Sequence, residues 1–143
     1  MLFDVGDVNE DGLNEIVASA GKDLVILDSE GNLLFKRSHT HVIYYIRLMD
    51  LDNDTVPEIT YALKDGKYRI FVLNVGKGEH EEPEVFDFTD SLNAHYRGAE
   101  DVSIEPVVAY DIDDDGKTEI LAVIATGYSW TPRGILALEY PSG

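Results

Sequence analysis

The sequence predicts an all-β chain made of tandem four-stranded antiparallel sheets. Short apolar runs recur along the chain, and turns rich in Asp, Asn and Gly separate them. An acidic loop also recurs three times, each time between two apolar runs. No segment carries an apolar stripe with the helical period, so almost no helix is expected. Four short strands in each unit of roughly 40–50 residues is the period of a β-propeller blade.

The expected strands follow one another without a long interruption. They cover 2–5, 16–18, 24–27 and 33–35 in the first unit, 42–49, 59–61, 68–73 and 85–88 in the second, and 107–110, 120–124 and 134–140 in the third. The pair Asp65-Gly66 marks a tight hairpin turn.

We interpret residues 1–143 as a single propeller segment. Blade 1 covers about 1–40, blade 2 about 41–103 and blade 3 about 104–143, and the last blade lacks its fourth strand. Closed propellers have about four to eight blades. The chain is therefore expected to be a partial propeller, as a fragment of a larger ring or as a unit that self-associates.

Composition narrows the classes of partner. The chain has 28 acidic and 11 basic residues, for a net charge of -17, which excludes binding to nucleic acid or to anionic membranes and favours cations. A hydrophobic fraction of 44% supports a packed core, and no apolar run is long enough to insert into a membrane. The absence of cysteine excludes disulfides and thiolate metal sites. Residues 1–4 have no basic and apolar leader pattern, so no signal peptide is expected in this chain.

Each acidic loop follows the pattern Asp-x-Asp/Asn-x-Asp, with a glutamate at position 9 counted from the first aspartate. Side-chain oxygens at positions 1, 3 and 5 point inward together, and a carbonyl at position 7 and the carboxylate at position 9 complete the shell. Hard oxygen ligands in a flexible loop favour Ca²⁺ over Mg²⁺. Two carboxylates about 4 Å apart repel by roughly 4 kcal/mol at an effective dielectric near 20, so a cation is needed. Up to three Ca²⁺ ions are expected, held by Asp7, Asn9, Asp11, Leu13 and Glu15; by Asp50, Asp52, Asp54, Val56 and Glu58; and by Asp111, Asp113, Asp115, Lys117 and Glu119.

The middle loop is expected to be the exception. It has Thr55 at position 6, where the other loops have glycine, and Pro57 at position 8, so we expect its backbone to differ. Solvated Asp and Asn turns without metal are the alternative for any one loop, and the shared register of three loops favours metal. An EF-hand or dockerin is excluded, because both need an acidic residue at position 12 and a helix after it. Position 12 is occupied by Ala18, Tyr61 and Ala122.

Two segments, 3–12 and 110–116, resemble FG-GAP (VCBS-type) repeats. The resemblance covers nearly the whole chain. It implies blades like those of integrin α-subunit-like propellers and of many secreted microbial proteins, with Ca²⁺ held between the first two strands of a blade. The resemblance extends to the side-chain ligands of all three loops, from Asp7 to Glu119. The Gly-Ala-Pro ending of the repeat is replaced by Ala18-Ser19-Ala20-Gly21, so no integrin-like function is inferred.

A ligand face is expected opposite the acidic loops, where the links between blades and the last hairpin tip lie. Aromatic and arginine side chains on loops suit the recognition of sugars or peptides. Alternatively, the tyrosine and tryptophan of the hairpin tip cover the strand ends as a small core. We interpret the histidines as solvated residues and not zinc ligands, because no neighbouring carboxylate orients them. The candidates are His39, His41, His95, Tyr96, Arg97, Tyr128, Trp130 and Arg133.

No catalytic motif occurs in the sequence. The paired carboxylates lie within metal loops, where a cation keeps them ionised and unsuited to acid catalysis. The leading hypothesis is therefore a non-catalytic, calcium-stabilised module for adhesion or ligand recognition in an exported, extracellular or cell-surface protein, with a protein or carbohydrate partner. The alternative is the propeller portion of a polysaccharide-active enzyme, such as a calcium-dependent lyase, with Arg97, Arg133 or His95 at a sugar groove.

Overall fold

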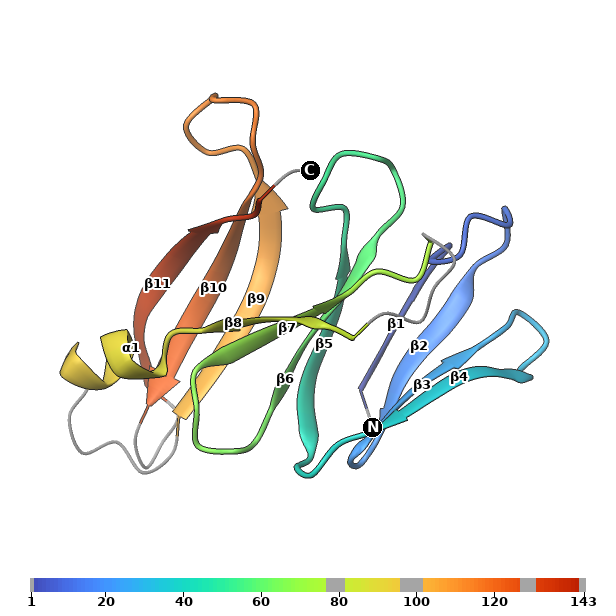
Figure 1. Ribbon diagram of the computed structural model, residues 1–143, viewed down its shortest axis with the longest axis horizontal. Coiled ribbons are helices and arrows are strands. Elements are labelled where there is room, and N and C mark those ends of the chain that lie inside the picture. The colour runs from blue at the N-terminus through green and yellow to red at the C-terminus, as the bar shows by residue number, and fades with distance from the viewer. Residues whose placement is uncertain (1, 77–81, 96–101, 127–130, 142–143) are drawn as a thin grey trace.

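The chain folds into three antiparallel sheets, each built from strands that follow one another in the sequence (Figure 1). This computed structural model describes residues 2–76, 82–95, 102–126 and 131–141. The first sheet contains β1 (Phe3–Gly6), β2 (Glu15–Ala20), β3 (Asp23–Leu27) and β4 (Leu33–Ser38); the second contains β5 (Ile43–Met49), β6 (Glu58–Leu63), β7 (Arg69–Leu73) and β8 (Glu84–Asp87); the third contains β9 (Val102–Tyr110), β10 (Glu119–Thr126) and β11 (Thr131–Glu139). The prediction of an all-β chain with four-, four- and three-stranded antiparallel sheets is confirmed.

A short helix, α1 (Thr89–His95), lies between β8 and β9, although almost no helix was expected from the sequence. The Asp87 carboxylate accepts a hydrogen bond from the Thr89 amide at 2.9 Å, and Leu92 packs against the core. A single buried apolar residue and one hydrogen bond at the helix start do not produce an apolar stripe with the helical period. The sequence pattern therefore could not predict this helix. No helix in the described ranges is long and apolar enough to cross a membrane.

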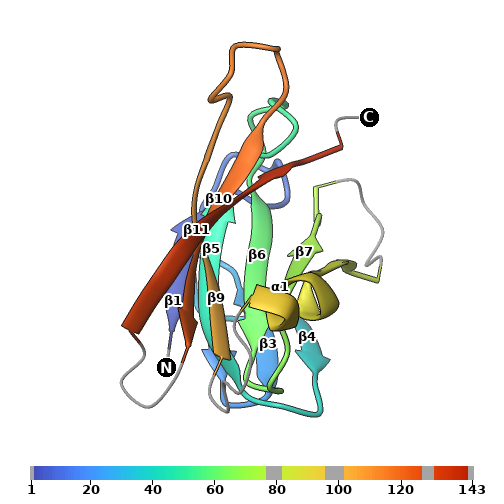
Figure 2. The ribbon, with the colours of Figure 1, turned by 90° about the vertical axis from the view of Figure 1, so that its left-hand side faces the viewer.

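The second sheet lies between the other two and is buried on both faces. All six residues of β6 are buried. Figure 2, viewed from the side of the third sheet, shows the sheets one behind another. Val17 and Ile26 of the first sheet pack with Ile59 and Tyr61 of the second, while Ala62 belongs to the core shared with the third sheet. Alternation along β6 thus supplies both cores from one strand.

Hydrogen bonds also join neighbouring sheets. The Leu48 amide donates to the Asp4 carboxylate at 2.9 Å, between β5 and β1. The Tyr44 hydroxyl donates to the Ile104 carbonyl at 2.9 Å and accepts from the Ile104 amide at 2.7 Å. Each inter-sheet contact therefore combines an apolar core with a specific polar bond.

Candidate metal centre

The three acidic loops lie at the same edge of the three sheets, at the top of Figure 1. Each connects the first two strands of its sheet: β1 to β2, β5 to β6, and β9 to β10. The strand order therefore presents three similar loops side by side.

The loops share one backbone path. Position 4 has a left-handed conformation in each, with φ of 63° at Glu10, 62° at Asn53 and 59° at Asp114. Position 6 does too, with φ of 83° at Gly12, 88° at Gly116 and 76° at Thr55. The expectation that the middle loop has a different backbone is wrong at this position. Threonine adopts a conformation that glycine takes at much lower cost.

The hydrogen bonds within the loops also repeat. The first aspartate accepts from the amide at position 6, at 2.9 Å in the first loop, 3.1 Å in the second and 2.8 Å in the third. The position-5 carboxylate accepts from the amide at position 7, at 2.8, 2.8 and 2.9 Å. The residues expected to offer carbonyl ligands therefore donate their amides to the loop; they are Leu13, Val56 and Lys117. These and the position-6 amides hold the carboxylates at positions 1 and 5 inside the loop.

The glutamate at position 9 is buried at the base of each loop, where it contacts the start of the loop. Glu15, Glu58 and Glu119 are only 1%, 1% and 7% exposed, and each begins the second strand of its sheet. Each accepts the position-2 amide, at 3.1 Å from Val8, 2.8 Å from Leu51 and 2.9 Å from Ile112. A buried carboxylate under an acidic loop is an unfavourable arrangement without a compensating cation.

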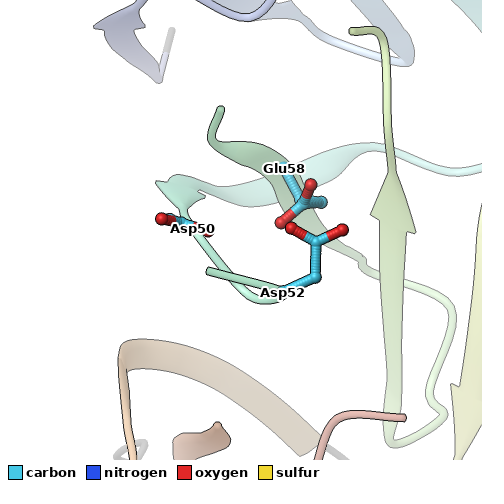
Figure 3. Close-up of side chains that lie close together, drawn as sticks. All are labelled: Asp50, Asp52 and Glu58. Atoms are coloured by element: carbon cyan, nitrogen blue, oxygen red, sulfur yellow. The ribbon is translucent and has the colours of Figure 1, made fainter. Parts of the chain in front are cut away.

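The middle loop brings three carboxylates together (Figure 3). One oxygen from each of Asp50, Asp52 and Glu58 lies within 4.8 Å of the others. Burial raises the pKa of Glu58 to about 7, and the charges of the loop aspartates add to this effect against the hydrogen bond from Leu51. Asp50 Oδ1 is buried and has no hydrogen-bond partner among the described residues. An inward oxygen without a donor is what a bound cation would satisfy.

The third loop also brings together three carboxylates, those of Asp111, Asp113 and Asp115, again within 4.8 Å. They are more exposed than those of the middle loop. The Lys117 ammonium lies 3.6 Å from Asp115 Oδ2 and 2.7 Å from Glu139 Oε1 on β11. This loop therefore has a cation of its own beside one candidate ligand.

The first loop differs in having an amide at position 3. Asn9 Oδ1 accepts from the Asp11 amide at 3.0 Å, and Asn9 Nδ2 donates to Asp11 Oδ2 at 3.1 Å. Asp7 Oδ1 is buried without a hydrogen-bond partner in the part of the chain that the structure describes, as in the middle loop. Burial raises the pKa of Glu15, against the hydrogen bond from Val8. The amide leaves this loop with one carboxylate fewer among its candidate ligands than the others have.

A cavity of about 300 Å³ adjoins the first loop. Its walls include Val8, Ile26 and Phe35, with Asn9 and Glu15 at its polar side. It lies on the loop side of the molecule and not at the opposite edge, where the ligand face was expected.

The loops also touch one another through residues that their own pattern does not include. Asn53 Nδ2 donates to Thr118 Oγ1 at 3.2 Å, between the second and third loops. A Cβ placed on Gly76 would lie 2.9 Å from Val56 Cγ1 and 3.6 Å from Glu10 Cγ, so this glycine fits between the first and second loops. These contacts could not be predicted from the sequence, because no local spacing signals them.

The expected ligand-face residues are only partly placed. His39 and His41 lie in the link between β4 and β5, at the edge opposite the loops in Figure 1. The His39 ring is half-buried against Tyr61 and Phe71, with ring centroids 5.3 and 6.0 Å away, so it is a packing residue; His41 is exposed. His95 ends α1 and Arg133 lies in β11, and their side chains lie outside the described part. Tyr96, Arg97, Tyr128 and Trp130 fall outside the described residues altogether.

Comparison with protein-family models, with curated proteins and with solved structures finds no match to this chain.

Among the described residues, the loops are therefore the best-defined chemical feature. Their ligand atoms are all oxygens, and in the middle and third loops they converge from three carboxylates. Such a donor set fits a hard divalent cation of high coordination number. A bound ion would neutralise the clustered carboxylates and keep them ionised, which favours binding and bracing and not proton transfer.

Proposed function

We propose that this chain is a calcium-binding β-propeller repeat module of the FG-GAP (VCBS) type, acting as a non-catalytic structural or ligand-recognition domain of an exported protein. The observation that carries the proposal is the repetition of one loop geometry in three sheets. The same backbone path, the same amide-to-carboxylate bonds and the same buried glutamate recur in each. A simple solvated turn does not require a buried glutamate or the same set of amide-to-carboxylate hydrogen bonds in all three sheets.

The buried oxygens at position 1 support a cation over a simple turn. Asp7 Oδ1 and Asp50 Oδ1 lack a hydrogen-bond partner in the described ranges, and a buried acceptor left unpaired costs about 1–3 kcal/mol. Ca²⁺ would satisfy these oxygens and offset the repulsion among the loop carboxylates. Mg²⁺ prefers a tighter octahedron and keeps its waters, so we expect it to bind more weakly.

In this proposal the ions brace the junctions between blades. The loops contact one another through Asn53, Thr118 and Gly76, so ordering one loop supports the next. Sites of this kind in extracellular modules have dissociation constants of roughly 10⁻⁴–10⁻³ M, which the calcium outside cells would fill. This range is the reason for proposing an exported protein.

Calorimetry of the chain in EDTA, in millimolar Ca²⁺ and in millimolar Mg²⁺ tests the proposal. Calcium at about ten times the dissociation constant stabilises by about 1.4 kcal/mol per site. In a chain of this length such a gain raises Tm by roughly 3–6 °C. Titration calorimetry should give up to three sites. An identical Tm in EDTA and in saturating Ca²⁺ would contradict the proposal.

A pair of variants locates the effect. Asp50→Asn with Asp52→Asn keeps the oxygen acceptors but removes two charges, so the variant should be at least as stable as wild type in EDTA and less stable in Ca²⁺. The matched control is Asp28→Asn, in the β3–β4 turn, where the carboxylate serves the amides of Glu30 and Asn32. The control should leave the calcium-induced shift unchanged. If the calcium-induced rise in Tm decreased equally in both variants, calcium would act only as a general counterion.

A further inference from the structure

The outer face of the first sheet is mainly apolar. Residues that lie opposite one another in neighbouring antiparallel strands share a face. On this face one row contains Phe3, Ala18 and Val25 and ends in Lys36, whose ammonium pairs with Asp23 at 2.9 Å. The next row contains Val5, Ile16, Leu27 and Leu33. Phe3 is 66% exposed and Leu33 58%, whereas the rows between them, with Val17 and Ile26, are buried against the second sheet.

The outer face of the third sheet is mainly apolar as well. One row contains Val108, Leu121 and Ala137, and the next contains Val123 and Ile135 with Glu105 on β9. Tyr110 lies at the loop end, in a row with Glu139. Ile135 is 77% exposed and Tyr110 65%. The alternate rows, with Ile120, Ala122 and Leu138, pack against the second sheet. The stack of sheets thus ends in an apolar face on both sides.

These two faces are the two sides of an interface that already occurs twice inside the chain. Position 10 of the acidic loops is Ile16, Ile59 and Ile120. Ile59 packs toward the first sheet and Ile120 packs toward the second, but Ile16 faces outward and is half-exposed. The first sheet therefore presents the face that every later sheet uses to contact the sheet before it.

Position 11 shows the opposite side of the same interface. Val17 packs toward the second sheet, and Thr60, in a row with Val72, faces the third. The equivalent Leu121 faces outward and is only half-buried. The third sheet therefore presents the face that every earlier sheet uses to contact the sheet after it.

We propose that a second copy of this chain docks head-to-tail, with the third sheet of each copy packed on the first sheet of the other. The contact repeats the internal interface of the chain, in which position 10 of one sheet faces the sheet before it and position 11 faces the sheet after it. Two copies would bring six sheets into one closed ring, within the range of about four to eight blades, whereas three copies would bring more than that range. The ring size rests on the proposed function only in treating the sheets as propeller blades.

Charge sets the conditions for this association. Each chain has a net charge of -17, so two copies repel at low ionic strength. The acidic loops lie at one edge of the sheets and not on the apolar faces (Figure 1). Salt near the physiological range should therefore promote pairing without competing for the interface.

Sedimentation velocity of the 143-residue chain, with calcium and salt, tests the proposal. We expect a species of twice the chain mass. Phe3→Glu on the first face and Ile135→Glu on the third should each convert it to a monomer, with at least a tenfold loss of dimer affinity. Val42→Glu, at an exposed valine in the β4–β5 link, should leave the dimer intact. A wild-type monomer, or larger open-ended assemblies, would overturn the proposal.

Mixing distinguishes head-to-tail pairing from a face that pairs with itself. An equal mixture of the Phe3→Glu and Ile135→Glu chains retains one intact contact per pair, so dimers should reappear although each variant alone is monomeric. Loss of the dimer in only one of the two variants would show self-pairing and overturn the proposal. A cooperative thermal unfolding transition in EDTA, followed by circular dichroism on both variants, verifies folding independently of association and of calcium. If Phe3→Glu does not fold, Leu33→Glu tests the same face, and Tyr110→Glu replaces Ile135→Glu in the same way.

Discussion

The side-chain amide of Asn74 donates to Glu58 Oε1 at 3.0 Å, directly beneath the middle acidic loop. Glu58 accepts the Leu51 amide with its other oxygen, so both oxygens of a buried carboxylate have donors. Asn74 follows β7, and so the segment after the third strand of the second sheet supports the loop between its first two strands. At this edge of the second sheet, the β5–β6 loop and the segment after β7 are thus connected by a hydrogen bond.

Removing this donor should weaken the middle loop. Asn74→Ala leaves Glu58 Oε1 buried without that partner, which costs about 1–3 kcal/mol. We expect urea denaturation in Ca²⁺ to show a loss in this range, together with weaker calcium binding at one site. Asn93→Ala, at an exposed asparagine in α1, is the matched control and should stay within about 0.5 kcal/mol of wild type. Equal stability of the two variants would show that the bond to Glu58 contributes nothing.

Replacing Thr55 by glycine should stabilise the chain. Thr55 has φ of 76°, a conformation that costs a β-branched residue about 1–2 kcal/mol, whereas Gly12 and Gly116 take it freely at the same loop position. The greater freedom of glycine in the unfolded chain offsets part of the gain. We therefore expect Thr55→Gly to raise Tm by roughly 1–3 °C. Thr40→Gly, in the β4–β5 link at a threonine outside the positive-φ region, should lower it instead.

The acidic loops and the order of the strands could be predicted from the sequence because both depend on local signals. An aspartate or asparagine at every second position, with a glutamate at position 9, sets its own hydrogen bonds within one loop, as the loop from Asp7 to Glu15 illustrates. The strands beside each loop carry apolar residues that must be buried somewhere. Their antiparallel neighbours then follow from the short connections.

The contacts that join the loops to one another and to the neighbouring segments could not be predicted from local signals. The partners Asn74 and Glu58 lie 16 residues apart, and Asn53 and Thr118 lie 65 apart, so each pair depends on how whole sheets pack. Thr55 shows the opposite problem, because its local preference argues against the conformation that the loop imposes. Hydrogen bonds within the loop, from the Thr55 amide to Asp50 and from the Val56 amide to Asp54, overrule that preference.

Removing the Lys117 charge should tighten calcium binding at the third loop. Its ammonium lies 3.6 Å from Asp115 Oδ2 and competes with a bound cation for that oxygen. Lys117→Met should increase the affinity roughly two- to fivefold at low salt and less at high salt, because the side chain is partly exposed. Lys22→Met, at an exposed lysine between β2 and β3, removes the same charge from the chain and should change the affinity little. Titration calorimetry of the two variants separates the local effect from the general one.

His39 should make the chain less stable as the pH falls below about 6.5. Burial against Tyr61 and Phe71 lowers the pKa of its imidazole, as does Arg37, while Asp23 and Glu82 act in the opposite direction. The unfolded chain therefore binds a proton at a higher pH than the folded chain does. Between the pKa of His39 in the folded chain and its pKa in the unfolded chain, the stability of the chain rises with pH. The stability that the neutral His39 contributes is fully present above the unfolded-state pKa and is lost as the pH falls through the folded-state pKa.

His39→Phe keeps the ring packing and removes the titration, so its stability should fall less than that of wild type between neutral pH and pH about 5. The raised pKa of Glu58 gives a pH dependence of opposite sign, but it is present in both chains and cancels in the difference between them. His41→Phe, at an exposed histidine two residues away, should keep the wild-type slope. Urea denaturation across this pH range measures the slopes. The same slope in His39→Phe and wild type would mean that His39 protonates as readily in the folded chain as in the unfolded one.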